Sequence, residues 1–437
     1  MRLSVEQVLA LAPDAAAAKA GKQHGVAKPW KDLGQSAEAL WGQCQGSALY
    51  QVKIDLASLT CSCSCPSHKL PCKHSLGLLL LAAGSPTALP EAEPPEWVAA
   101  WLAKRAASAV QKVAREDGKK APVNAVAQAK RADERLAKVR AGVEGLDLWL
   151  SDLVRNGLAG LEQQPRAFWE GQAARLVDAQ APGLAGRVRR MAEIAGSGPE
   201  WPERLLAEMG RLALLAHAFT RLDTLPAALR EEVRQLVGWT LTQEEVATRG
   251  EHVADEWLAA GQWVEDEERV RTQRSWLIGA RTGRHALVLQ FSPKPMVPPF
   301  AESILPGTRQ HGEVVFWPGA APLRARFVTR EGAPEPMAAL PGVATLNAAL
   351  AAAAHALAEQ PWLDRFLFAL NGVTLARDAR QRWHVRDHLG ATLPLAPGDP
   401  WRLLAATSGQ PADLAAEWDG AALRPLLAGG ADGYHPL

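Results

Sequence analysis

The sequence lacks the features of an exported, membrane-spanning or disulfide-bonded protein. It has no uninterrupted apolar run of about 18 residues, the length that a membrane helix needs, and the apolar segment 76–84 is far too short. The N-terminus does not read as a secretion signal, because Glu6 interrupts its apolar stretch and Pro13 follows soon after. Only five cysteines occur in 437 residues, and none follows Cys72. We therefore expect no membrane contact and a cytoplasmic protein with reduced thiols.

Common catalytic motifs are also missing. There is no P-loop, no dinucleotide fingerprint, no His-Glu-x-x-His and no nucleophile elbow. His384 and His388 are four residues apart, but no third ligand is evident, so we interpret them as part of a solvated strand face. His217 and His355 lie among alanines and leucines and are interpreted as core or boundary residues. The acidic run 264–269 is typical of a solvated turn. We therefore predict no catalytic residues, no organic cofactor site and no enzymatic activity.

The length of the chain and the change in its local sequence patterns predict a multidomain α+β protein. A chain of 437 residues exceeds one ordinary core, and sixteen tryptophans can anchor several cores. Four proline residues mark a linker at 85–96, and a change from helical to strand-like patterns occurs near residue 250. The predicted organisation is a small hairpin-plus-helix module at 1–87 (the hairpin and helix themselves at about 38–84), a linker and basic helix at 88–122, an all-α region at 123–245, and a β-rich, Trp-containing region at 246–437.

The N-terminal module has clear local signals. Ser4 followed by Gln7 resembles a capping box, which predicts a helix over 4–20. Two strands are predicted at 39–45 and 48–56, joined by a two-residue turn at Gly46-Ser47. A helix is predicted over 75–84, ended by Gly84.

The rest of the chain gives weaker signals. The stretch 117–122 is predicted to break the basic helical segment in two. From Leu136, apolar residues recur every three or four positions, which indicates an amphipathic helix that ends at Asn156-Gly157. After residue 250 most segments are predicted as strands, including 400–409, with one helix at 346–360.

The cysteines form a tight cluster that predicts a zinc site. All five lie within residues 44–72, which is unlike a disulfide framework. Cys63-x-Cys65 and Cys72-x-His74 supply four soft or borderline ligands, as zinc prefers. The second pair begins a predicted helix, whose positive end favours thiolate.

Other residues compete for the ligand positions. Cys61 and Cys63 also form a Cys-x-Cys pair, although Pro66 favours the pair Cys63 and Cys65. His68 is a further candidate. Cys44, on a predicted strand, is interpreted as a small buried hydrophobic residue.

The segment CSCPSHKLPCKHSLGLLLL (63–81) resembles the SWIM zinc finger, whose pattern is Cys-x-Cys, a spacer, then Cys-x-His. WGQCQGSALYQVKIDL (41–56) is similar to the hairpin that precedes it in a bacterial group of these proteins. The resemblance implies Zn²⁺ bound by Cys63, Cys65, Cys72 and His74, recognition of DNA or protein, and no catalysis. The layout resembles long bacterial members, whose genes often lie near MoxR-type AAA+ ATPases and von Willebrand A-domain proteins.

The charge distribution leaves two partner classes open. Residues 1–90 hold eight Lys and Arg against five Asp and Glu, and residues 102–140 hold eleven against four. Such a basic third could contact DNA phosphates, or it could be a solvated alanine-rich helical linker. No aromatic residue lies between Trp101 and Trp149, which argues against single-strand binding. We expect protein partners, with direct DNA binding and a C-terminal enzyme as alternatives, and the oligomeric state is left open.

Overall fold

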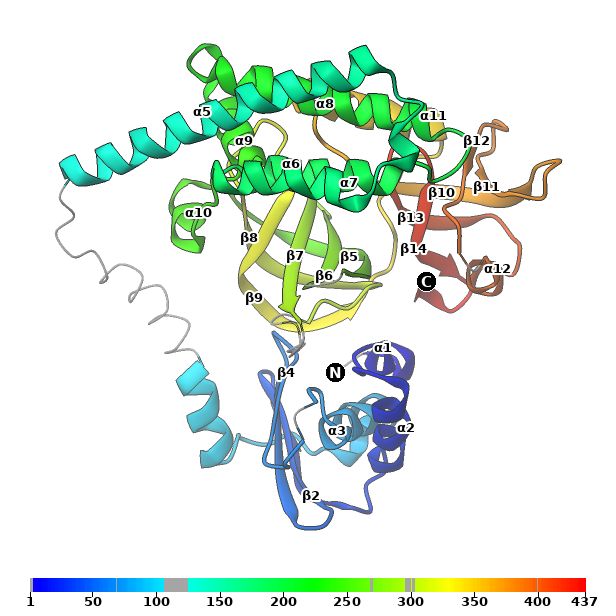
Figure 1. Ribbon diagram of the computed structural model, residues 1–437. Coiled ribbons are helices and arrows are strands. Elements are labelled where there is room, and N and C mark those ends of the chain that lie inside the picture. The colour runs from blue at the N-terminus through cyan, green and yellow to red at the C-terminus, as the bar shows by residue number, and fades with distance from the viewer. Residues whose placement is uncertain are drawn as a thin grey trace.

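The computed structural model describes residues 3–67, 69–105, 125–267, 270–294, 300, 303–398 and 400–437. Figure 1 shows an N-terminal module at one end, a β-barrel in the middle, and a helical bundle on the far side of the barrel, with a second sheet beside it. The fold class is α+β, as predicted. The barrel follows the bundle in sequence but lies between the bundle and the N-terminal module in space.

In the N-terminal module, the last of three helices packs on a four-stranded antiparallel sheet of order β1-β2-β3-β4, and the first two helices pack against that last helix. Its core includes Leu40 and Ile54 from the sheet and Leu78 and Leu79 from the last helix, all fully buried. The elements are α1 (Val5–Ala10), α2 (Ala15–His24), β1 (Trp30–Gln35), β2 (Ala39–Gln45), β3 (Leu49–Asp55), β4 (Thr60–Cys63) and α3 (Lys73–Gly84).

Two local predictions in this module need correction. The capping box of Ser4 and Gln7 is present, but the single helix over 4–20 is wrong. The chain makes two helices because Asp14 starts a new one, its carboxylate accepting the Ala17 N–H at 2.7 Å. The hairpin loop has three residues, 46–48, instead of two, because Gln45 pairs with Leu49. Strands β1 and β4 were not predicted as strands at all.

The proline-rich segment after α3 lies along the edge of β1. A short 3₁₀ helix, η1 (Pro86–Ala88), leads into a parallel bridge between Gln35 and Glu91. Residues 96–105 are helical and pack on the outer face of the sheet, where Lys53 lies between the rings of Trp97 and Trp101. The predicted break at 117–122 falls outside the described residues.

The helical region follows the predicted periodicity. Val139, Val143 and Leu146 are buried in one core together with apolar residues from the other helices. The long first helix ends at Asn156, and Gly157 has a φ of +81°, which glycine adopts without strain. The elements are α5 (Ala125–Asn156), η2 (Leu161–Gln163), α6 (Arg166–Asp178), α7 (Pro182–Ile194), α8 (Trp201–Thr220), η3 (Leu222–Thr224), α9 (Ala227–Val237) and α10 (Gln243–Arg249).

The β-rich region consists of a closed barrel and an open sheet. The barrel has the order β5-β6-β7-β9-β8, and the six-stranded sheet has the order β12-β11-β10-β13-β14-β15. The barrel strands are β5 (His252–Asp266), β6 (Val270–Gly279), β7 (His285–Pro293), β8 (Thr308–Phe316) and β9 (Arg324–Pro336). The remaining elements are α11 (Leu346–Glu359), β10 (Phe366–Arg377), β11 (Trp383–Arg386), β12 (Thr392–Pro394), α12 (Trp401–Thr407), β13 (Ala412–Trp418), β14 (Leu423–Gly430) and β15 (Gly433–Pro436).

The strand predicted at 400–409 is wrong, because this segment forms α12. Leucine, alanine and arginine all favour helix, and Pro400 is tolerated just before the first turn. Leu403 is its buried contact, and Ser408 ends it with a left-handed backbone.

Specific contacts join the N-terminal module to the barrel, and the barrel to the open sheet. The turn between β3 and β4 meets the barrel, where the Gln310 side chain donates to the Ala57 carbonyl at 2.7 Å and Leu305 enters the module's core. The barrel meets the open sheet at Glu417, whose buried carboxylate accepts hydrogen bonds from Trp276 and Arg365. None of the described helices is long and apolar enough to cross a membrane.

Candidate zinc site

The cysteine and histidine cluster forms where β4 ends and α3 begins. Cys63 is the last residue of β4, and Cys65 follows in the loop that leaves the strand. Cys72 is the N-cap of α3, and His74 is the second residue of that helix. One donor atom from each of these four residues lies within 4.8 Å of the other three. The structure thus brings together the four residues that the sequence predicted.

The donor set fits a zinc ion. Three thiols and one imidazole are the soft and borderline donors that four-coordinate zinc takes in structural sites. Cys72 and His74 are 1% and 2% exposed, so the cluster is shielded from solvent on the α3 side. The His74 ring approaches through Nδ1, which lies 3.7 Å from the Cys63 sulfur. The cluster is therefore able to hold Zn²⁺ with protein atoms in all four positions.

Electrostatics concentrates negative charge at Cys72. The Cys63 thiol donates a hydrogen bond to this sulfur, which lowers the pKa of Cys72 well below its usual range and raises the pKa of Cys63. The N–H of Ser75 in the first turn of α3 also points to the Cys72 sulfur, at 3.5 Å. A thiolate at a helix N-terminus is the form that binds metal, as the sequence suggested.

The competing ligands lie in other environments. The Cys61 thiol donates to the Leu59 carbonyl at 3.6 Å, and burial raises the pKa of this thiol to about 12. Cys44 is fully buried, and burial raises its pKa to about 11, so it has the predicted character of a small buried residue. His68 is outside the described residues. Lys69 pairs with Asp14 at 2.6 Å.

One neighbour of the cluster was missed. His24, at the end of α2, lies beside His74 with ring centroids 4.9 Å apart. It precedes His74 by 50 residues and belongs to no recognisable motif, so only the packing of α2 on α3 reveals it.

Within the described part of the chain, no other histidine belongs to a cluster of potential metal ligands. His217 and His355 are exposed on α8 and α11, so their interpretation as core or boundary residues is wrong. His217 instead faces Asp147 at 3.3 Å. His384 and His388 lie on β11 and in the turn after it, as predicted, and each ring Nδ1 contacts a backbone carbonyl.

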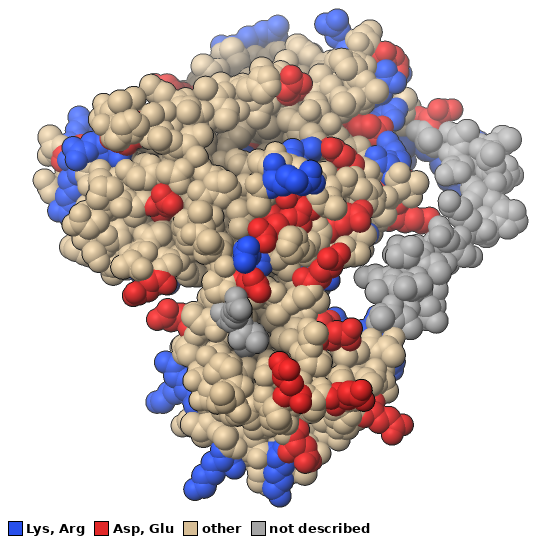
Figure 2. All heavy atoms as spheres, turned by 180° about the vertical axis from the view of Figure 1, so that it is seen from behind, with Lys and Arg blue, Asp and Glu red and all other residues tan. Residues whose placement is uncertain are grey.

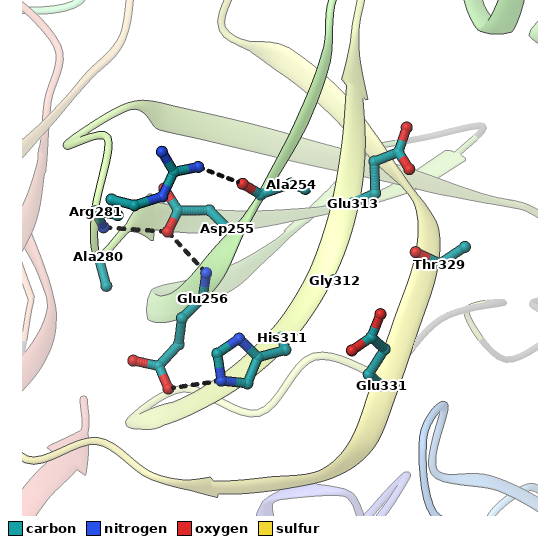
Figure 3. A pocket seen from close by; sticks show the side chains of 10 residues that line it. All are labelled: Ala254, Asp255, Glu256, Ala280, Arg281, His311, Gly312, Glu313, Thr329 and Glu331. Atoms are coloured by element: carbon teal, nitrogen blue, oxygen red, sulfur yellow. Dashed lines mark hydrogen bonds and ion pairs between the residues drawn. The ribbon is translucent and has the colours of Figure 1, made fainter.

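The barrel carries a shallow depression of about 550 Å³ on its outer surface, shown in Figure 3. Acidic side chains line it, but several of them are already paired. Asp255 accepts hydrogen bonds from Thr282, and Glu256 lies 3.5 Å from His311. The carboxylates of Asp255 and Glu256 are therefore held by neighbours of the same barrel.

Two family models match the chain. The model of the SWIM zinc finger matches residues 50–83, which contain the four-residue cluster. The model of the SWIM-associated four-helix bundle domain matches residues 134–237, which cover most of α5 and all of α6 to α9. No curated protein and no solved structure matches the chain. The chain therefore contains a SWIM zinc finger, followed by a SWIM-associated four-helix bundle domain.

Proposed function

We propose that this chain is a non-catalytic recognition protein in which Cys63, Cys65, Cys72 and His74 bind one structural zinc ion. The observation that carries the proposal is the convergence of four protein donors within 4.8 Å. A zinc ion with four protein ligands has no open position for an activated water, so it stabilises the fold instead of performing chemistry. The zinc ties β4 to α3 and thereby shapes the surface of the module.

The charge pattern favours a protein partner over DNA. Several cations of the basic N-terminal third are occupied within the chain: Lys53 donates to the Trp97 carbonyl at 3.1 Å, and Arg105 pairs with Asp55 at 3.3 Å. Figure 2 shows acidic side chains gathered across the middle and lower part of one face of the molecule. DNA phosphates would be repelled there, whereas a protein surface with basic groups would be attracted.

We further propose that 1–87, 123–245 and 246–437 are separate structural units, with 88–122 as a linker and basic helix between the first two. The resemblance to long bacterial members favours an assembly with a MoxR-type AAA+ ATPase and von Willebrand A-domain proteins as the first partners to test. Direct DNA binding through the basic segment is the second candidate.

The ligand set is tested by metal analysis of the purified chain. We expect about one zinc per chain, loss of that zinc in Cys72→Ser, and full retention in the matched variant Cys61→Ser. A wild-type chain without zinc, or loss in Cys61→Ser with retention in Cys65→Ser, would overturn the proposed set.

The partner class is tested by two binding experiments on the same preparations. Tagged wild-type chain and Cys72→Ser are used to recover partners from native cells, and DNA is titrated in a gel-shift assay at low and high salt. We expect protein partners that are lost with Cys72→Ser and no DNA shift. A salt-sensitive shift at low salt, also lost with Cys72→Ser, would support the DNA alternative instead.

A further inference from the structure

The second ring nitrogen of His74 has no hydrogen-bond partner among the described residues. Its Nδ1 faces Cys63, whereas its Nε2 is buried and makes no hydrogen bond with any described residue. When a metal occupies Nδ1, the proton of the neutral ring is on Nε2. A buried N–H without an acceptor destabilises the folded state by about 1–3 kcal/mol. We therefore expect a hydrogen-bond acceptor near Nε2 when zinc is bound.

Two side chains from other elements lie next to this ring. A ring nitrogen of His24, the sulfur of Cys44 and a ring nitrogen of His74 are all within 4.8 Å of one another. The rings of His24 and His74 meet edge to face, and the Cys44 sulfur is 3.7 Å from Nδ1 of His24. Tyr50 also contacts His74, but it stacks on the ring face and offers no acceptor to an in-plane N–H.

The fold places His24 there by several independent contacts. Gly77 of α3 lets α2 approach closely, because a Cβ at that position would lie only 2.4 Å from the His24 Cβ. The indole of Trp30 donates to the His24 carbonyl at 2.8 Å. Cys44, on β2, is fully buried behind the ring. Contacts from α3, β1 and β2 therefore fix the position of His24 beside the zinc ligand His74.

We propose that His24 and Cys44 form a positioning pair for His74, in which His24 accepts the hydrogen bond of His74 Nε2–H in the zinc-bound state and Cys44 holds the His24 ring. In this structure Nε2 of His74 makes no hydrogen bond to His24, so the proposed contact belongs to the zinc-bound state. Such partners orient a ligating imidazole, and their loss typically weakens metal binding about 10- to 100-fold. The inference rests on the proposed ligand set.

The test measures zinc affinity of the full chain by competition with a chromophoric chelator. His24→Ala is expected to weaken zinc binding about 10- to 100-fold, and His24→Gln, which keeps an acceptor oxygen, is expected to recover most of this loss. Cys44→Ala should cause a smaller loss, and His355→Ala, an exposed histidine on α11, should cause none. Unchanged affinity in His24→Ala, or no recovery in His24→Gln, would overturn the proposal.

Cobalt substitution separates positioning from ligation. The visible spectrum of the Co²⁺-loaded chain should show the bands of a tetrahedral site with three thiolate ligands. These bands should be the same in wild type and in His24→Ala. A change of coordination in His24→Ala would refute a positioning role. A second tightly bound metal in wild type that is lost in both Cys44→Ala and His24→Ala would refute it as well, because His24 and Cys44 would then be ligands. A wild-type chain without any metal would instead contradict the ligand set itself.

Discussion

Replacing Gly77 by alanine tests how closely α2 and α3 must pack to support the zinc site. A Cβ at residue 77 would lie 2.4 Å from the His24 Cβ and 3.0 Å from the His24 carbonyl carbon and oxygen. These atoms belong to the backbone or are fixed to it, so rotation of a side chain cannot relieve the clash. Overpacking of this kind costs about 1–3 kcal/mol, and alanine recovers up to about 1 kcal/mol of helix propensity.

Because the clashing atoms are fixed to the backbone, the cost lies in the upper part of that range, about 2–3 kcal/mol. Less up to about 1 kcal/mol of helix propensity, we expect Gly77→Ala to destabilise the module by about 1–2 kcal/mol. The matched control is Gly84→Ala, in the last turn of the same helix, where nothing lies within 4 Å of the added Cβ. The assay is urea unfolding of the full chain, followed by zinc release to a chelator, which reports on the module alone. With a slope of about 1–2 kcal/mol per molar urea, the midpoint should fall by about 1 M. An unchanged or raised midpoint for Gly77→Ala would refute the reasoning.

Three further outcomes are expected. Chelation of zinc, or lowering the pH so that the thiolates bind protons, should unfold the module but leave the helical core intact, as measured by hydrogen exchange of α3 against α8. Arg187→Ala should destabilise the bundle by about 3–5 kcal/mol, because Glu208, 3.0 Å away, would remain as a buried unpaired charge; a calorimetric change below about 1 kcal/mol would contradict this. Glu417→Ala should loosen the open sheet from the barrel, seen as increased accessibility of Trp263 and Trp276 to a fluorescence quencher, since both indoles donate to this carboxylate.

Local patterns predicted those elements whose cause is local. The capping box at Ser4, the apolar period from Val139 to Leu146 and the stop at Gly157 each depend on a few neighbouring residues, and each is present. The prediction failed where a local pattern fits two structures. Residues 401–407 combine apolar residues with good helix formers, and this segment forms a helix although a strand was predicted.

Other features depend on distant partners. β1 carries the polar sequence WKDLGQ and is a strand because β2 pairs with it on one side and the segment around Glu91 on the other. The exposure of His217 likewise depends on how α8 packs on α5. The residues around these positions carry no sign of either contact.

The sequence by itself determined the zinc chemistry of this protein, because the two ligand pairs are close along the chain and their spacing restricts how they can converge. It also determined the order of a small metal module, a helical region and a β-rich region, since periodicity is a local property. Only the tertiary structure decided what surrounds the metal cluster, because it brought His24 and Cys44 beside His74. These contacts come from the packing of α2 on α3 and of α3 on the sheet, which joins residues up to 50 positions apart.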